Sequence, residues 1–144
     1  MSGHVPFDLD IIGGTRALNS LIHEVLAAGE DALQLYRATS RQGLRFKADK
    51  SPVTEADHAV EARLSGFIAK HYPEAGFLGE ESGVHGQEAG MRFVVDPIDG
   101  TRAFVRRLPT WSILLGMEYA GEAVLGIAYQ PAQDQLFVAV KGHG

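Results

Sequence analysis

The sequence predicts a single α+β domain in which two N-terminal helices pack on a mainly antiparallel sheet. Residues 10–39 and 54–72 carry apolar side chains at three- and four-residue steps, as amphipathic helices do. Five short apolar runs follow, and turn residues separate the last three of them. The length of 144 residues suits one domain with an ordinary core.

The helical pattern places the first helix over residues 10–39 and the second over residues 54–72. Between them, residues 44–47 are predicted to form a short strand. Pro73 and Gly76 end the second helix. Its predicted buried face consists of Val60, Leu64, Phe67, Ile68 and His71.

The strands follow the second helix. Residues 77–79 are predicted to form a strand that stops at Glu80, and residues 82–90 a polar loop. Residues 93–95 form a buried strand, and residues 102–108 a short helix. Three further strands, joined by tight turns into an antiparallel meander, are predicted over residues 110–119, 123–129 and 136–140.

Composition excludes several classes of protein. The formal net charge is −5 and no basic stripe occurs, which argues against nucleic acid as a partner. The chain has no cysteine, so it can form neither a disulfide frame nor a thiolate metal site. No apolar stretch is long enough to cross a bilayer, and the N-terminus lacks the pattern of a signal peptide. A cytoplasmic protein without a membrane partner is therefore expected.

Two carboxylates stand at the centre of the functional prediction. Asp96 and Asp99 follow the strand at 93–95 and are predicted to lie in the turn before the short helix. Pro97 restricts that turn. Two carboxylates this close repel each other unless a cation offsets their charge. Because the nearby ligands are oxygens only, Mg²⁺ fits better than Zn²⁺.

The start of the short helix adds an anion site. Gly100 and Thr101 precede residues 102–108, so their backbone N–H groups are available to a phosphate. A hard cation beside an anion site suggests phosphoryl chemistry. The alternative is a plain Asp-Pro-x-Asp-Gly surface turn. The strand in front and the helix behind favour a site.

Other acids have competing interpretations. Thr54 and Asp57 have the spacing of a capping box, with Thr54 at the N-cap, and this is an alternative to catalysis for Asp57. Glu80 and Glu81 follow an apolar strand, where consecutive residues point to opposite faces, so one of them is expected to face the metal. For either Glu, an exposed acidic loop is the alternative.

Three ordered motifs together resemble the inositol monophosphatase superfamily of Mg²⁺-dependent, lithium-sensitive phosphatases. They are Lys47-x-Asp49 with Ser51-Pro52-Val53-Thr54-x-x-Asp57, then Gly79-Glu80-Glu81-Ser82, then Asp96-Pro97-Ile98-Asp99-Gly100-Thr101. The resemblance implies the N-terminal half of a layered αβαβα fold. Residues 1–144 would be its metal- and phosphate-binding domain. A C-terminal substrate domain, which supplies a further Asp ligand in the family, would be absent.

The resemblance also implies the metal ligands. Glu80, Asp96 and the backbone carbonyl of Ile98 would hold the first Mg²⁺, and Asp96 and Asp99 the second. Glu80 would face a third, weakly bound ion through water. A complete site would thus hold two or three ions.

The same resemblance assigns the remaining site residues. Thr101, paired with Asp57, would help to activate the water nucleophile, and Glu80 would share that task. The N–H groups of Gly100 and Thr101 would hold the phosphate. No other cofactor is implied.

The substrate prediction depends on the branch of the superfamily. Thr101-Arg102-Ala103-Phe104, followed by Leu108-Pro109-Thr110-Trp111, most resembles histidinol phosphatases, so histidinol phosphate and histidine biosynthesis are expected. An inositol phosphate, or another sugar or nucleotide (bis)phosphate, is the alternative. An alternative from a different functional class is a truncated, non-catalytic fragment that at most binds metal and phosphate. The family also implies a homodimer.

Overall fold

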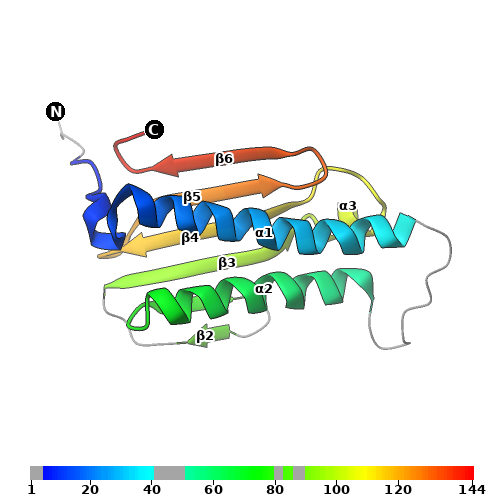
Figure 1. The fold of residues 1–144 in the computed structure, drawn as a ribbon, viewed down its shortest axis with the longest axis horizontal. Helices are drawn as coiled ribbons and strands as arrows, with labels where there is room; N and C mark the ends of the chain where they lie inside the picture. The colour runs from blue at the N-terminus through cyan, green and yellow to red at the C-terminus, as the bar shows by residue number, and fades with distance from the viewer. Residues whose placement is uncertain (1–4, 41–50, 80–82, 86–89) are drawn as a thin grey trace.

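The computed structural model describes residues 5–40, 51–79, 83–85 and 90–144. Two long helices lie side by side across one face of a six-stranded sheet (Figure 1). Four antiparallel pairs and one parallel pair join the six strands. The predicted α+β class, with two N-terminal helices on a mainly antiparallel sheet, is confirmed.

The helical layer begins with a short 3₁₀ turn, η1 (Leu9–Ile12), followed by α1 (Gly14–Ser40) and α2 (Pro52–His71). A third helix, α3 (Thr101–Val105), is only five residues long. Within the described part of the chain, none of the helices is both long and apolar enough to span a bilayer.

The start of α2 corrects one prediction. Ser51, and not Thr54, is the N-cap, and its hydroxyl accepts a hydrogen bond from the Thr54 backbone N–H at 3.2 Å. Pro52 explains the shift, because its fixed φ suits the first turn of a helix. Asp57 therefore lies beyond the capping positions, and the capping-box interpretation of this residue is wrong.

The buried face of α2 differs from the predicted one at its end. Val60, Leu64 and Ile68 are buried as predicted. His71 is exposed, so its placement on the buried face is wrong. The helix ends at this residue, with Tyr72 as its C-cap, and His71 instead stacks beside Phe67 with ring centroids 4.3 Å apart.

The strands lie in the order β2-β1-β3-β4-β5-β6. The predicted meander is confirmed as β4 (Ser112–Tyr119), β5 (Glu122–Gln130) and β6 (Gln135–Val140). The predicted strand over residues 77–79 is β1 (Gly76–Gly79), which pairs in parallel with β3 (Met91–Asp99).

The segment between β1 and β3 differs from its prediction. Residues 82–90 were expected to form a loop, but β2 (Gly83–His85) lies among them and pairs with β1. Such a three-residue strand is too short to show a hydrophobic period. The strand predicted over residues 44–47 lies outside the described residues.

The core lies between the helices and the sheet. Alternate residues of β3 and β4, such as Phe93, Val95 and Leu115, point toward the helices and are buried. They meet the apolar faces of α1 and α2, which Arg63 also joins through ion pairs to Glu24 and Asp31 at 3.0 and 2.9 Å. The contacts with α1 and the sheet therefore hold α2 against β3, the strand that carries Asp96 and Asp99.

Candidate metal and phosphate site

The end of β3 carries both predicted acids within the strand. The predicted turn at Asp96 and Asp99 is wrong, since both residues belong to β3. The pairing with β4 changes register between them: Asp96 faces Leu114, whereas Asp99 faces Ser112. The extra residue on β3 forms an irregularity of the kind that re-aims side chains beside functional sites. Such irregularities also tolerate a proline, which lacks a backbone donor.

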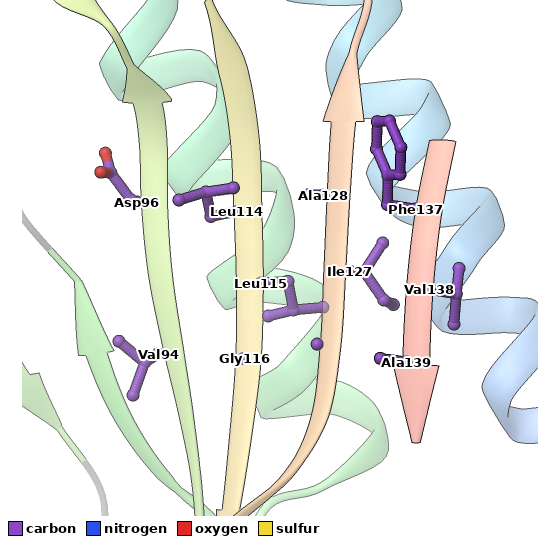
Figure 2. Close-up of a pocket in the computed structure, with 11 residues that line it drawn as sticks. Val94, Asp96, Leu114, Leu115, Gly116, Ile127, Ala128, Phe137, Val138 and Ala139 are labelled. Atoms are coloured by element: carbon purple, nitrogen blue, oxygen red, sulfur yellow. The ribbon is translucent and has the colours of Figure 1, made fainter. Parts of the chain in front are cut away.

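Asp96 points to the face of the sheet opposite the helices. Its side chain extends from the end of β3, while Val94 and Leu114 lie nearby on the same side (Figure 2). Together with Phe137 of β6 these residues line a shallow apolar trough. The residue is half-buried, and its Oδ1 atom is buried. Asp99, at the last position of β3, is exposed.

Gly100 turns the chain from β3 into α3. Its φ of 89° and ψ of 46° lie in the left-handed region, which glycine adopts without strain. A Cβ at this position would also approach the Cα of Trp111 to 3.4 Å. Thr101 follows as the exposed first residue of α3. The carbonyl of Ile98, which the family resemblance implies as a ligand, belongs to a residue with 2% exposure.

An aromatic cluster fixes α3 in place. Tyr36 of α1, Phe104 of α3 and Trp111 contact one another, with ring centroids 4.9 to 5.5 Å apart. The Tyr36 hydroxyl also donates a hydrogen bond to the carbonyl of Arg107 at 2.9 Å. Because Phe104 and Trp111 are both buried, the chain on either side of α3 is held by packing. Gly100 and Thr101 therefore sit on a rigid support.

Asp57 approaches from the helix layer. It lies in α2, is half-buried, and has a buried Oδ1 atom. Its helix contacts both β3 and α3. Because Ser51 is the N-cap of α2, capping does not account for the position of Asp57.

Five of the predicted residues lie in the segment that runs from the end of β3 to the first residue of α3, and a sixth lies in α2. The segment is Asp96, Ile98, Asp99, Gly100 and Thr101, and the helix residue is Asp57. Glu80, the seventh, lies outside the described residues. Among the residues that the structure describes, no three acids or histidines form a group able to hold a metal ion. The predicted convergence of Glu80, Asp96 and Asp99 stays a prediction.

The donor set nevertheless fits a hard cation. Its side chains are carboxylates and its main-chain donor is a carbonyl, and these oxygen ligands are the ones that Mg²⁺ takes. Cysteine is absent from the whole chain. The irregular end of β3 brings two of the carboxylates within three residues of each other, directly before a turn with free backbone N–H groups.

The chain belongs to the inositol monophosphatase family, whose model matches residues 17–144. It is 38% identical over 117 residues to the histidinol-phosphatase of Chlorobaculum parvum, which covers 81% of this chain and 45% of that protein. It is 30% identical over 128 residues to the inositol-1-monophosphatase of Mesorhizobium japonicum, covering 88% of this chain and 48% of that protein.

Solved structures of the same family share the fold. The extragenic suppressor protein suhB from Bartonella henselae superimposes with a TM-score of 0.77 at 30% identity, over 90% of this chain and 50% of that one. Inositol monophosphatase-II from Staphylococcus aureus superimposes with a TM-score of 0.73 at 30% identity, over 89% and 47%. The chain spans about half the length of the curated relatives it matches.

Proposed function

We propose that this chain is the metal- and phosphate-binding half of a Mg²⁺-dependent phosphomonoesterase. The observation that supports the proposal most strongly is the irregular end of β3, where Asp96 and Asp99 stand directly before Gly100 and Thr101. Two carboxylates so close together repel each other, and a bound cation offsets that repulsion. By the family resemblance, a C-terminal domain would complete the substrate pocket and supply a further ligand.

The proposed ligands of Mg²⁺ are the carboxylates of Glu80, Asp96 and Asp99 and the backbone carbonyl of Ile98. When bound, the ion would neutralise charge on the phosphoryl oxygens and make water a better nucleophile. Two or three ions would occupy a complete site.

The chain's own groups position the reactants. Backbone N–H groups of Gly100 and Thr101 donate hydrogen bonds to the phosphate oxygens, which phosphoryl transfer needs for orientation and charge stabilisation. The Thr101 hydroxyl would orient the attacking water and pass its proton on to the Asp57 carboxylate, and Glu80 would share the task of activating that water. Packing of Phe104 and Trp111 holds the donors still during the reaction.

Histidinol phosphate is the proposed substrate, and histidine biosynthesis the proposed setting. The support is the identity of 38% to a histidinol-phosphatase, together with the motif around α3. An inositol phosphate, or another sugar or nucleotide (bis)phosphate, is the second candidate, because an inositol-1-monophosphatase is also a relative. A cytoplasmic homodimer is proposed from the resemblance alone.

A third candidate is a non-catalytic module that binds metal and phosphate. In this candidate the site binds Mg²⁺ and phosphate but hydrolyses no ester.

Phosphate release from a substrate panel tests the proposal. Histidinol phosphate, inositol 1-phosphate and a nucleotide bisphosphate are incubated with MgCl₂ and with this chain or a longer protein that contains it. Release that requires Mg²⁺ and is lost in Asp96→Asn supports the proposal. Release that needs no metal, or that persists in Asp96→Asn, contradicts it. Binding of Mg²⁺ and inorganic phosphate without turnover favours the non-catalytic module.

A further inference from the structure

Glu61 is a charged residue whose position the proposed chemistry does not explain. It lies in the middle of α2 and is only 4% exposed. Within the described ranges of the chain, it is the one acidic residue that is buried. Burial of a carboxylate is costly, so a helix surface that faces a core normally carries an apolar residue at such a position.

The Glu61 carboxylate lies directly against Gly79 at the end of β1. A Cβ built on Gly79 would overlap Oε1 of Glu61 and would lie 2.6 Å from its Cδ. The φ angle of Gly79 is outside the left-handed region, so its backbone conformation does not require glycine. Glycine is favoured there because the Glu61 carboxylate occupies the space that a side chain would need. The helix α2 and the strand β1 therefore pack closely at this point.

This contact lies beside the proposed site in two ways. Gly79 pairs with Val95, the residue before Asp96, in the parallel ladder of β1 and β3. Glu61 also follows Asp57 by four residues, which places both on one face of α2 about one turn apart. Glu61 thus connects the helix that carries Asp57 to β1, the strand that pairs with β3 just before Asp96.

We propose that Glu61 is a positioning residue for the metal site: its carboxylate, held against Gly79, sets the position of α2 on the sheet and hence that of Asp57 relative to Asp96. The proposal rests on the proposed function, because it assigns Glu61 a role at that same site. A rigid helix transmits a change at Glu61 to Asp57 over a single turn. Residues that orient metal ligands typically change metal affinity by about 10- to 100-fold when they are altered.

Isothermal titration of the 144-residue chain with MgCl₂ tests this role. Glu61→Gln keeps the size of the side chain but removes its charge and replaces one acceptor oxygen with an N–H₂ donor, so it changes the polar contacts that hold the carboxylate in place and not the volume it fills. We expect it to weaken Mg²⁺ affinity about 10-fold at a temperature where thermal unfolding shows the variant to be fully folded. Glu74→Gln, an equal charge change at an exposed position just beyond α2, should leave the affinity unchanged.

A second variant covers the case in which Glu61→Gln does not fold. Glu61→Met replaces the carboxylate with an apolar side chain of similar length, a type of exchange that folded proteins often accept. It should also weaken Mg²⁺ binding about 10-fold. Unchanged affinity in whichever of the two variants folds overturns the positioning role, and so does failure of both to fold, because Glu61 would then be needed for folding itself.

Asp96→Asn separates this inference from the proposed function. If Asp96→Asn removes Mg²⁺ binding while Glu61→Gln leaves it intact, the inference fails and the proposed function stands. If the unaltered chain binds no Mg²⁺, or Asp96→Asn binds it normally, the proposed function fails, and the inference fails with it.

Discussion

The two ends of β3 differ in how their charged side chains are arranged. Near its start, Arg92 faces Glu118 of β4 in a regular register, and their side chains form an ion pair at 2.7 Å. At its other end the register changes, and the same strand carries Asp96 and Asp99. At the first end, each charged side chain has a partner of opposite charge. At the second end, two negative side chains lie where the pairing of β3 with β4 is irregular.

This difference indicates that stability and function are assigned to different parts of one strand. The regular part places Phe93 and Val95 in the core, at 0% and 3% exposure. The irregular part leaves Asp99 exposed and Asp96 half-buried. Local rules of packing are broken at functional sites more often than elsewhere. Substitutions at the two ends should therefore have separable effects.

The largest effect on stability is expected at the regular end. Phe93→Ala removes a fully buried ring that also contacts Tyr72, with centroids 5.1 Å apart. The free energy of unfolding should fall by about 3–5 kcal/mol, because the cavity cannot fully close. Chemical denaturation measures the change. A loss below about 1 kcal/mol, the size seen for surface substitutions, would show that this end does not carry the core.

A large effect on binding, with little effect on stability, is expected at the irregular end. Asp96→Asn removes one carboxylate of the proposed metal site, and Mg²⁺ affinity should fall about 100-fold, which equals about 2.8 kcal/mol. The unfolding midpoint without metal should stay the same or rise, because two like charges no longer repel each other. Calorimetry and thermal unfolding measure the two quantities. A large loss of stability with unchanged affinity would reverse the assignment of the two ends.

A smaller effect is expected at the support behind the irregular end. Tyr36→Phe keeps the ring stacked on Phe104 and Trp111 and removes only the hydrogen bond to the Arg107 carbonyl. The free energy of unfolding should fall by about 1 kcal/mol. Chemical denaturation measures it, with Tyr119→Phe as a matched control in β4. Equal effects in both variants would show that this hydrogen bond does not help to fix α3.

The smallest effect is expected where charge is already balanced. Glu118→Gln removes the partner of Arg92, and both side chains are more than a third exposed. The loss of stability should be about 0.5 kcal/mol, because exposed ion pairs contribute little. Mg²⁺ affinity should not change, which also makes this variant a control for Asp96→Asn. A clear drop in Mg²⁺ affinity would show that the two ends of β3 are not independent.

Much of the fold follows from local patterns in the sequence. The long apolar periods of α1 and α2 and the turns between β4, β5 and β6 are strong signals. At Ala120 and Gly121 the backbone takes positive φ angles of 51° and 81°, the geometry of a tight hairpin. The short strand β2 carries no such signal, because three residues cannot display a period.

The errors in the site prediction have physical causes. The sequence predicts Asp96 and Asp99 in a turn that Pro97 restricts, but the change of register lets β3 continue through the proline to Asp99. Thr54 was predicted as a cap from its spacing, and the preceding Ser51-Pro52 pair is the stronger signal. In both cases a tertiary or neighbouring contact decided between two locally acceptable structures.

Other residues could not be assigned from the sequence, because their roles depend on distant contacts. Tyr36, Phe104 and Trp111 are far apart in the chain and meet only in the fold. From its charge, Glu61 would be placed on the surface, and its burial against Gly79 is seen only in the folded structure. The one signal in the sequence was its spacing of four residues from Asp57, which places both residues on the same face of the helix.

The central claim is that the end of β3 and the start of α3 together bind Mg²⁺. A titration of the ¹⁵N-labelled chain with MgCl₂, followed by NMR, tests it most directly. We predict saturable shifts of amide resonances between Asp96 and Thr101, absent in Asp96→Asn. Saturation without shifts in this segment, or shifts that persist in Asp96→Asn, would contradict the claim.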